Sequence, residues 1–213
     1  MGHGLRLASG RLVAPFVCGA PEPSPAISSH THSCSLLSDS HGDSWRLGGI
    51  AQNGSAETAM VELQDTTLFA SMRDRGPSSR DSFRLSARSR TAGESWGDFS
   101  TIRSLRAPCT EHWCSGVVAG LAALNASGAR PSLLVYSQPS APHSRRALRF
   151  YLSDDGGGQE WRSGPVLWPE LAGYSDITAV GSDSVGILFE CGTATFSDRI
   201  SFAVVGRSFL TGT

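Results

Sequence analysis

Short stretches in which apolar and polar residues alternate recur along most of the chain, and turn-forming residues separate them. Alternation with a period of two is the signature of a half-buried β-strand. The stretch 117–124 fits a helix or a buried strand equally well, whereas 19–33 and 138–144 are typical of exposed loops. We expect strands at 59–63, 67–71, 132–136 and 200–205.

Three of the alternating stretches lead into the same turn pattern. The segments 34–45, 83–96 and 148–161 each continue through a serine, a second oxygen-bearing residue and a glycine to a tryptophan. In such a turn the oxygen atoms hold backbone N–H groups, the glycine takes a positive φ, and the tryptophan covers the turn. The chain between successive patterns has room for about four short strands, as in a propeller blade. The alternative is a coincidence in a serine-rich chain.

The strand pattern resumes on both sides of every loop, so we expect one all-β domain over residues 1–213.

The formal net charge is −1, and all 18 basic residues are arginines. The balanced charge disfavours nucleic-acid binding, and the lack of lysine excludes Schiff-base and P-loop lysine chemistry. The planar fork of arginine suits carboxylate recognition instead. No apolar run reaches the roughly 18 residues of a membrane span, so we expect no integral membrane segment.

The five cysteines are an odd number, scattered and without a C-x-x-C pair. This arrangement predicts core thiols in place of a disulfide framework or a zinc ribbon. His30, His32 and Cys34 would place three metal-ligand types on one strand face, but the sequence offers no fourth ligand beside them. We therefore expect no metal site, and nothing in the sequence requires a cofactor.

The turn pattern resembles the Asp box, S-x-D-x-G-x-T-W, of the sialidase (neuraminidase) family. Asp155 retains the box aspartate in the third segment, whereas Ser40 and Thr91 replace it in the first two. Hydroxyl groups cap such turns more weakly than a carboxylate. The resemblance implies a six-bladed β-propeller that lacks its N-terminal blades, with residues 1–213 forming roughly its last four. It also implies that the boxes lie on the outer rim, away from the reaction.

The residues between the boxes resemble sialidase active-site motifs in the family's order. Tyr174, in Gly-Tyr-Ser-Asp, matches the catalytic tyrosine, which would act as the nucleophile. Glu57, in Glu-Thr-Ala-Met-Val-Glu-Leu, matches the glutamate that is the partner of this tyrosine. Glu190, in Leu-Phe-Glu-Cys-Gly, matches the glutamate that holds the first of the family's three carboxylate-binding arginines.

The second and third of these arginines also have counterparts. Arg73, in Leu-Phe-Ala-Ser-Met-Arg, matches the second, and Arg145 lies where the third is expected before the box serine Ser153. The neighbouring Arg146 is the alternative to Arg145, and Ala147 stands where the family has an asparagine. We find neither the motif of the first arginine nor that of the aspartate acid/base in these residues, so we expect a fragment of a longer enzyme.

These residue types suit a sialoside, whose anomeric carbon carries a carboxylate. A carboxylate nucleophile would approach against like charge, whereas a phenol is neutral and needs only a base to take its proton. The resemblance thus implies an exo-α-sialidase that cleaves sialylated glycans of gangliosides, glycoproteins or oligosaccharides with retention. The alternatives are an inactive sialic-acid-binding module and an Asp-box scaffold for protein binding. Family members are lysosomal, membrane-associated or cytoplasmic, and the oligomeric state stays open.

Overall fold

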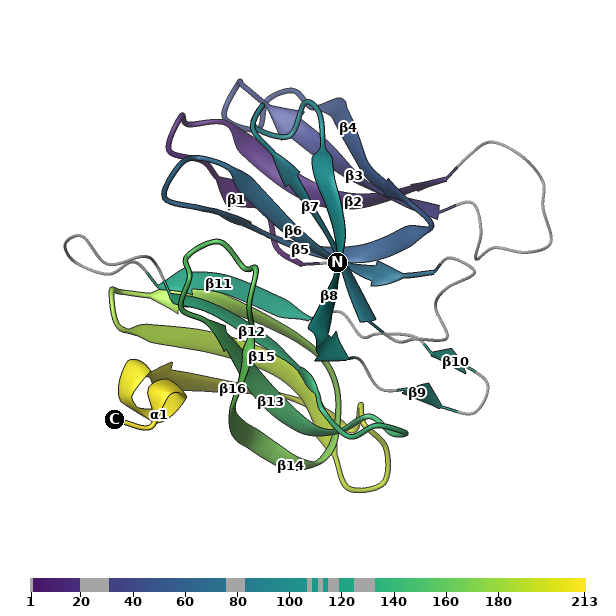
Figure 1. The fold of residues 1–213 in the computed structure, drawn as a ribbon, viewed down its shortest axis with the longest axis vertical. Coiled ribbons are helices and arrows are strands. Elements are labelled where there is room, and N and C mark those ends of the chain that lie inside the picture. Colours follow the sequence, from purple (N-terminus) through teal and green to yellow (C-terminus); the bar gives the residue numbers. More distant parts are fainter. Residues whose placement is uncertain are drawn as a thin grey trace.

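The architecture is a stack of antiparallel β-sheets (Figure 1). This computed structural model describes residues 2–19, 31–75, 83–106, 109–110, 113–114, 119–124 and 133–213. In the first two sheets the strands follow one another in chain order, so each sheet is a four-stranded meander of the kind that forms a propeller blade. The first sheet comprises β1 (Leu5–Arg6), β2 (Leu12–Gly19), β3 (Thr31–Ser38) and β4 (Arg46–Asn53). The second comprises β5 (Ser55–Glu62), β6 (Leu68–Asp74), β7 (Phe83–Ser89) and β8 (Gly97–Arg106).

The third large sheet has six strands because one long strand belongs to two meanders. The residues of β14 up to Leu171 pair with β13, and those from Leu171 onward pair with β15. A short pair, β9 and β10, stands apart from the large sheets. The six strands are β11 (Gly120–Leu124), β12 (Leu133–Pro139), β13 (Arg146–Ser153), β14 (Arg162–Val180), β15 (Ser184–Gly192) and β16 (Arg199–Gly206). The remaining elements are β9 (Cys109–Thr110), β10 (Trp113–Cys114) and the helix α1 (Arg207–Thr211).

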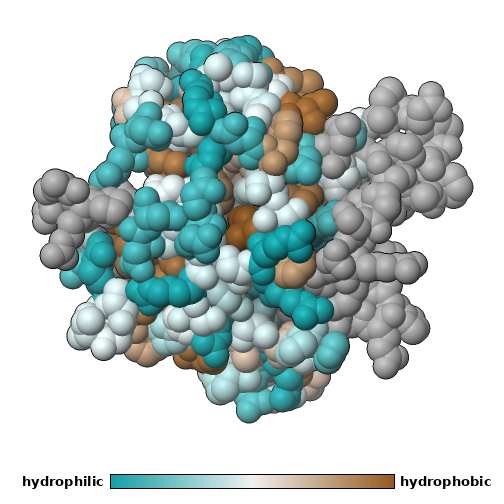
Figure 2. Space-filling model, in the orientation of Figure 1, coloured by the Kyte–Doolittle hydropathy of each residue, from teal (hydrophilic) through white to brown (hydrophobic). Residues whose placement is uncertain are grey.

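Three apolar clusters fill the spaces between successive meanders. Met60 and Met72 of the second sheet pack with residues of the first sheet, whereas Phe69 packs with residues of the third. Period-two alternation therefore places the two faces of β6 in two different cores. The third cluster joins β11–β13 to β15 and includes Phe150 and Ile187. Figure 2 shows mainly polar and neutral residues on the viewed face, with separate hydrophobic patches.

Most of the expected strands are confirmed. The runs at 59–63, 67–71, 132–136 and 200–205 correspond to β5, β6, β12 and β16. The stretch 117–124, for which a helix and a buried strand were both open, contains strand β11. The loop expected at 138–144 is wrong at its start, because Gln138 and Pro139 pair with β13 and Gln138 is buried. The short helix α1 was not expected. Within the described ranges there is no helix with the length and hydropathy of a membrane span.

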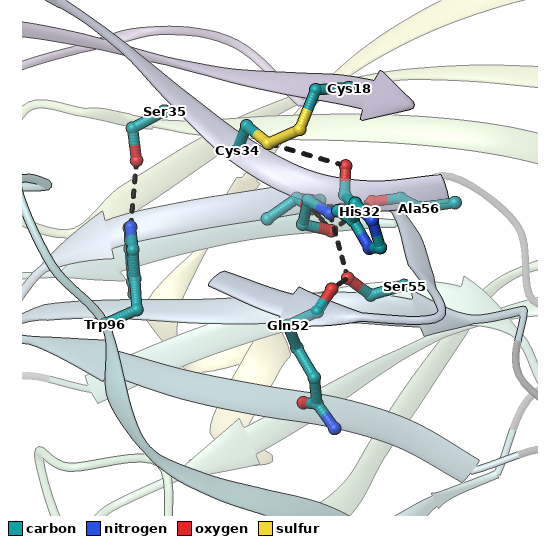
Figure 3. The surroundings of a disulfide bond; sticks show 10 residues. Cys18, His32, Cys34, Ser35, Gln52, Ser55, Ala56 and Trp96 are labelled. Carbon is teal, nitrogen blue, oxygen red and sulfur yellow. Dashed lines mark hydrogen bonds between the residues drawn. A yellow bond between two sulfur atoms is a disulfide. The ribbon is translucent and has the colours of Figure 1, made fainter. Parts of the chain in front are cut away.

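The prediction of core thiols is wrong for two cysteines, because Cys18 and Cys34 form a disulfide between β2 and β3 (Figure 3). Their Cα atoms lie 6.1 Å apart, within the usual range for a disulfide. Cys34 is buried and is therefore both a core residue and a cross-link. Cys191 is a buried free thiol, as expected.

The three repeated turns have the hydrogen bonds that the pattern predicts. They connect β3 to β4, β7 to β8 and β13 to β14. The hydroxyl groups of Ser40 and Thr91 accept one backbone N–H each, from Ser44 at 2.8 Å and Ser95 at 2.9 Å. The Asp155 carboxylate accepts four, from residues 157–160, and also the Ser153 hydroxyl. The box glycines Gly42 and Gly93 have positive φ as predicted, whereas in the third turn the two neighbours of the box glycine Gly157, Gly156 and Gly158, have it instead.

Candidate functional site

The first part of the candidate site is a buried ion pair between two neighbouring strands. Arg73 on β6 donates from Nη1 to Glu57 Oε1 on β5 at 2.7 Å, and their side chains are 5% and 17% exposed. The register of β5 against β6 shifts between Ser55 and Thr58, so Glu57 lies in an irregular part of the strand. Such irregularities often re-aim side chains at functional sites.

The Glu57 carboxylate has one oxygen engaged and one free. A second guanidinium, that of Arg75, lies 3.8 Å from Oε1. Oε2 is buried and accepts no hydrogen bond from any described residue. Burial lowers the pKa of Arg73, while the charge of Glu57 opposes this shift. The arrangement therefore leaves one buried carboxylate oxygen of Glu57 without a hydrogen bond from the described residues.

A buried arginine that the sequence does not distinguish supports this pair. Arg84 on β7 is 1% exposed, and its Nη2 donates to the backbone oxygen of Glu57 at 3.5 Å. Its guanidinium also lies 5.8 Å from the centroid of the Tyr136 ring. No motif marks Arg84, because an arginine in an alternating strand is ordinarily solvated.

The second part of the site lies on β14 and β15. The backbone N–H of Tyr174 donates to Glu190 Oε2 at 2.9 Å, and the register of β14 against β15 shifts between Ala172 and Ser175. At Gly173 an added Cβ would collide with the Glu190 carboxylate and lie 2.8 Å from Phe196. The glycine before the tyrosine is therefore required by the close approach of Glu190, which explains that part of the motif.

The structure separates the two neighbouring arginines that the sequence leaves as alternatives. The Arg145 guanidinium lies over two rings, with Cζ 5.3 Å from the centroid of Tyr174 and 4.5 Å from that of Phe196. Arg146 is exposed and forms a 3.1 Å ion pair with Glu170. Arg145 therefore joins Tyr174, and Arg146 does not. Phe196 is a further residue of this cluster that the sequence analysis missed.

The two parts lie near each other, because a negative charge on Tyr174 would raise the pKa of Arg73, although less than burial and Glu57 shift it. The contacts thus place the five residues expected at the site in two groups: Glu57 with Arg73, and Tyr174 with Arg145 and Glu190. Among the described residues, the phenol of Tyr174 makes no direct hydrogen bond with Glu57.

The pattern of His30, His32 and Cys34 at the start of β3 does not give three metal ligands in this structure. Cys34 is in the disulfide, which removes its thiolate as a ligand, and His30 lies outside the described residues. In the part of the chain that the structure describes, no group of three His, Cys, Asp or Glu side chains could hold a metal ion.

Comparisons with known proteins show the family and the fold to which this chain is similar. The family model of the BNR repeat-like domain matches residues 1–187. A sialidase of Micromonospora viridifaciens is 30% identical over 172 residues, which are 81% of this chain and 26% of that protein.

Solved structures give the same result for the fold. The Hadza microbial sialidase Hz136 matches with a TM-score of 0.73 and 25% identity, over 95% of this chain and 36% of its own. A leech intramolecular trans-sialidase complexed with 2,7-anhydro-Neu5Ac has a TM-score of 0.73 and 20% identity, over 98% of this chain and 32% of its own. The chain thus spans about a quarter to a third of the length of these proteins, and its sheets resemble part of their propeller. It belongs to the BNR repeat-like domain family and, within that family, to the sialidases.

Proposed function

We propose that this chain supplies the nucleophile and part of the carboxylate-binding site of an exo-α-sialidase that acts on sialylated glycans. The observation that carries the proposal is the connected set around Tyr174, in which the ring is covered by Arg145 and the backbone is held by Glu190. A tyrosine fixed in this way, beside two arginines, suits a substrate that carries its own carboxylate.

In the proposed reaction, Tyr174 Oη forms a bond to the anomeric carbon while the bond from that carbon to the leaving oxygen breaks. The phenolic proton passes to Glu57, whose Oε2 is unoccupied by any described donor. Movement of the two residues toward each other on substrate binding would supply the direct contact. An acid outside the assigned residues protonates the leaving oxygen, and water then hydrolyses the sialyl–tyrosine bond, so that the configuration is retained.

Arg73 and Arg145 would bind the substrate carboxylate by charge-assisted hydrogen bonds. Arg73 would then bind both Glu57 and the substrate carboxylate. Glu57 accepts a hydrogen bond from Nη1, and the buried Nε has no partner among the described residues and could donate to the substrate. Glu190 keeps the Tyr174 backbone in place and has the charge to hold a further arginine.

The test is a pair of measurements on the same protein. Binding of N-acetylneuraminic acid is measured by calorimetry, and turnover by release of a fluorophore from a sialoside. Tyr174→Phe is expected to remove most turnover and to leave sialic acid binding largely unchanged. Binding without turnover in the unmodified chain favours the inactive binding module, and no binding at all refutes the proposed site.

A further inference from the structure

A polar contact joins the beginning of the chain to the strand that carries Tyr174. His3 Nδ1 lies 2.9 Å from Asp176 Oδ1, and the two side chains are 34% and 35% exposed. The same Asp176 oxygen also accepts the backbone N–H of Ile177 at 3.0 Å. The carboxylate is thus fixed on its own strand, and the imidazole is the group that reaches across to it.

The other end of this contact is attached to the strand that carries Glu57. The backbone N–H of Gly2 donates to the Thr58 carbonyl at 2.9 Å, one residue after Glu57. A Cβ at Gly2 would lie 3.0 Å from that oxygen and 3.1 Å from Ala59 Cα, so the segment lies directly on β5. Figure 1 shows the N-terminus near the middle of the molecule, where the sheets meet.

Asp176 follows Tyr174 by two positions on β14, directly after the register shift between Ala172 and Ser175. A path of short contacts therefore runs from the Glu57 segment through Gly2, His3 and Asp176 to the Tyr174 segment. The distance between base and nucleophile depends on how β5 and β14 are held relative to each other. The site itself shows no direct hydrogen bond between Tyr174 and Glu57, so this distance has to be set by other contacts.

We propose that His3 is a positioning residue, which links the strand of Tyr174 to the strand of Glu57 through its contact with Asp176. We call this His3–Asp176 contact the clasp. It is strongest when the imidazole is protonated. This inference rests on the proposed function for its effect on catalysis. The clasp itself is a property of the fold and is testable without any substrate.

The charges around His3 support a pH-dependent clasp. The hydrogen bond to Asp176 raises the pKa of His3 more than partial burial lowers it. Asp176 on β14 is the titratable group that acts on the ring, and β2 carries no charged residue. Because the pKa in the folded state lies above the unfolded value of about 6.5, the stabilisation is fully present below that value. It is lost as the pH rises through the higher folded-state pKa.

The experiment uses His3→Gln, which keeps a hydrogen-bonding side chain but cannot be charged, and His3→Ala, which removes it. His41→Gln is the matched control, because His41 is an exposed histidine in the first box turn. Hydrogen exchange of residues 172–177 is followed by mass spectrometry across pH 5–8, after correction for the intrinsic pH dependence of exchange. NMR titration of the His3 imidazole is measured in the unmodified protein and in Asp176→Asn.

The clasp predicts that His3→Ala raises exchange in 172–177 about fivefold at low pH, the factor expected for one net hydrogen bond. His3→Gln should remove the pH dependence of that protection, and Asp176→Asn should lower the pKa of His3. Exchange in 172–177 that is unchanged in both His3 variants, or that rises equally in His41→Gln, overturns the clasp. Where sialoside turnover is measurable, His3→Gln should also flatten its decline above neutral pH. Absence of turnover in the unmodified protein counts against the proposed function alone, because the exchange result still decides on the clasp.

Discussion

The Arg145 guanidinium covers the ring of Tyr174 at 5.3 Å, although 28 residues and a change of strand partner separate them along the chain. The Arg145 carbonyl also accepts the backbone N–H of Ala172 at 2.9 Å, so the arginine is fixed to the Tyr174 strand at both ends. A cation over an aromatic face is worth about 0.5–2 kcal/mol. The contact therefore orients both the proposed carboxylate-binding group and the proposed nucleophile.

Arg145 and Arg146 form a matched pair for testing the carboxylate site. Arg145→Ala removes a guanidinium that faces the site, so we expect binding of N-acetylneuraminic acid to weaken by a factor of about 10–100, as for loss of a charge-assisted hydrogen bond. Arg146→Ala removes an exposed ion pair with Glu170 and should leave the affinity within about twofold. Calorimetric titration of both variants measures the difference, and equal losses would contradict the assignment of Arg145.

The third box turn should be the most dependent on pH. Burial of the Asp155 carboxylate opposes its ionisation, but the hydrogen bonds from Ser153 and the backbone outweigh this, and the pKa of Asp155 lies below its ordinary value. Its contribution to stability is therefore present above pH 4 or so and is lost as the pH falls through the lower folded-state pKa. We expect Asp155→Ala to cost about 1–2 kcal/mol at pH 7, discounted for the exposure of the turn.

Chemical denaturation of the unmodified protein and Asp155→Ala at pH 7 and pH 3 measures this difference. The gap in unfolding free energy should narrow at pH 3. Ser40→Ala is the control at the equivalent position of the first box, where a hydroxyl accepts one N–H. The smaller loss of unfolding free energy in Ser40→Ala should be the same at both pH values. If the loss in Asp155→Ala is also the same at pH 7 and pH 3, the ionised carboxylate does not stabilise the turn.

The features that the sequence predicts are those whose cause is local. A serine, an oxygen-bearing residue and a glycine at fixed spacing determine a turn by themselves: in the first two boxes the serine hydroxyl accepts the glycine N–H, and in the third Asp155 takes over this role. The glycine of the motif around Tyr174 has a cause that is not local, because Glu190, on the neighbouring strand β15, approaches Gly173 closely. The burial of Arg84 likewise depends on contacts between strands that the chain pattern does not encode.

The same reasoning explains the failure at the cysteines. An odd, scattered set gives no pairing, and Cys18 and Cys34 come together only because β2 and β3 pair with Phe16 opposite Cys34 and Cys18 opposite His32. The register, and not the spacing in sequence, brings the two thiols to neighbouring positions. The choice between Arg145 and Arg146 likewise required the structure, since adjacent residues differ only in the side to which they point.

The disulfide should contribute measurably to stability. It closes a loop with a sequence separation of 16, for which the chain-entropy model gives about 3 kcal/mol. We expect Cys18→Ala to lower the unfolding free energy by about 2–4 kcal/mol. The unmodified protein should lose a similar amount in dithiothreitol, whereas Cys18→Ala should lose clearly less in the reductant. Alkylation with iodoacetamide under denaturing conditions checks the bond directly, because reduction should expose two further thiols in the unmodified protein.

Ala147 has a backbone conformation that alanine disfavours. Its φ is 56°, and the register of β13 against β14 shifts at this position, between Arg146 and Leu148. The Ala147 carbonyl accepts both the backbone N–H of Ser140 at 3.0 Å and its hydroxyl at 2.8 Å, which holds the bulge in place. The bulge turns the chain immediately after Arg145, so the strain accompanies the placement of that side chain over Tyr174.

Replacing Ala147 should therefore stabilise the protein without disturbing the site. A non-glycine residue in the left-handed region costs about 1–2 kcal/mol, and asparagine tolerates it better than alanine. We expect Ala147→Gly and Ala147→Asn each to raise the unfolding free energy by about 0.5–1 kcal/mol. For glycine, the greater conformational entropy of the unfolded chain offsets part of the strain that is relieved. Ala203→Gly, in the regular strand β16, should lower it by a similar amount. Denaturant titration distinguishes these signs, and a loss of stability in both Ala147 variants would mean that the bulge is not present in solution.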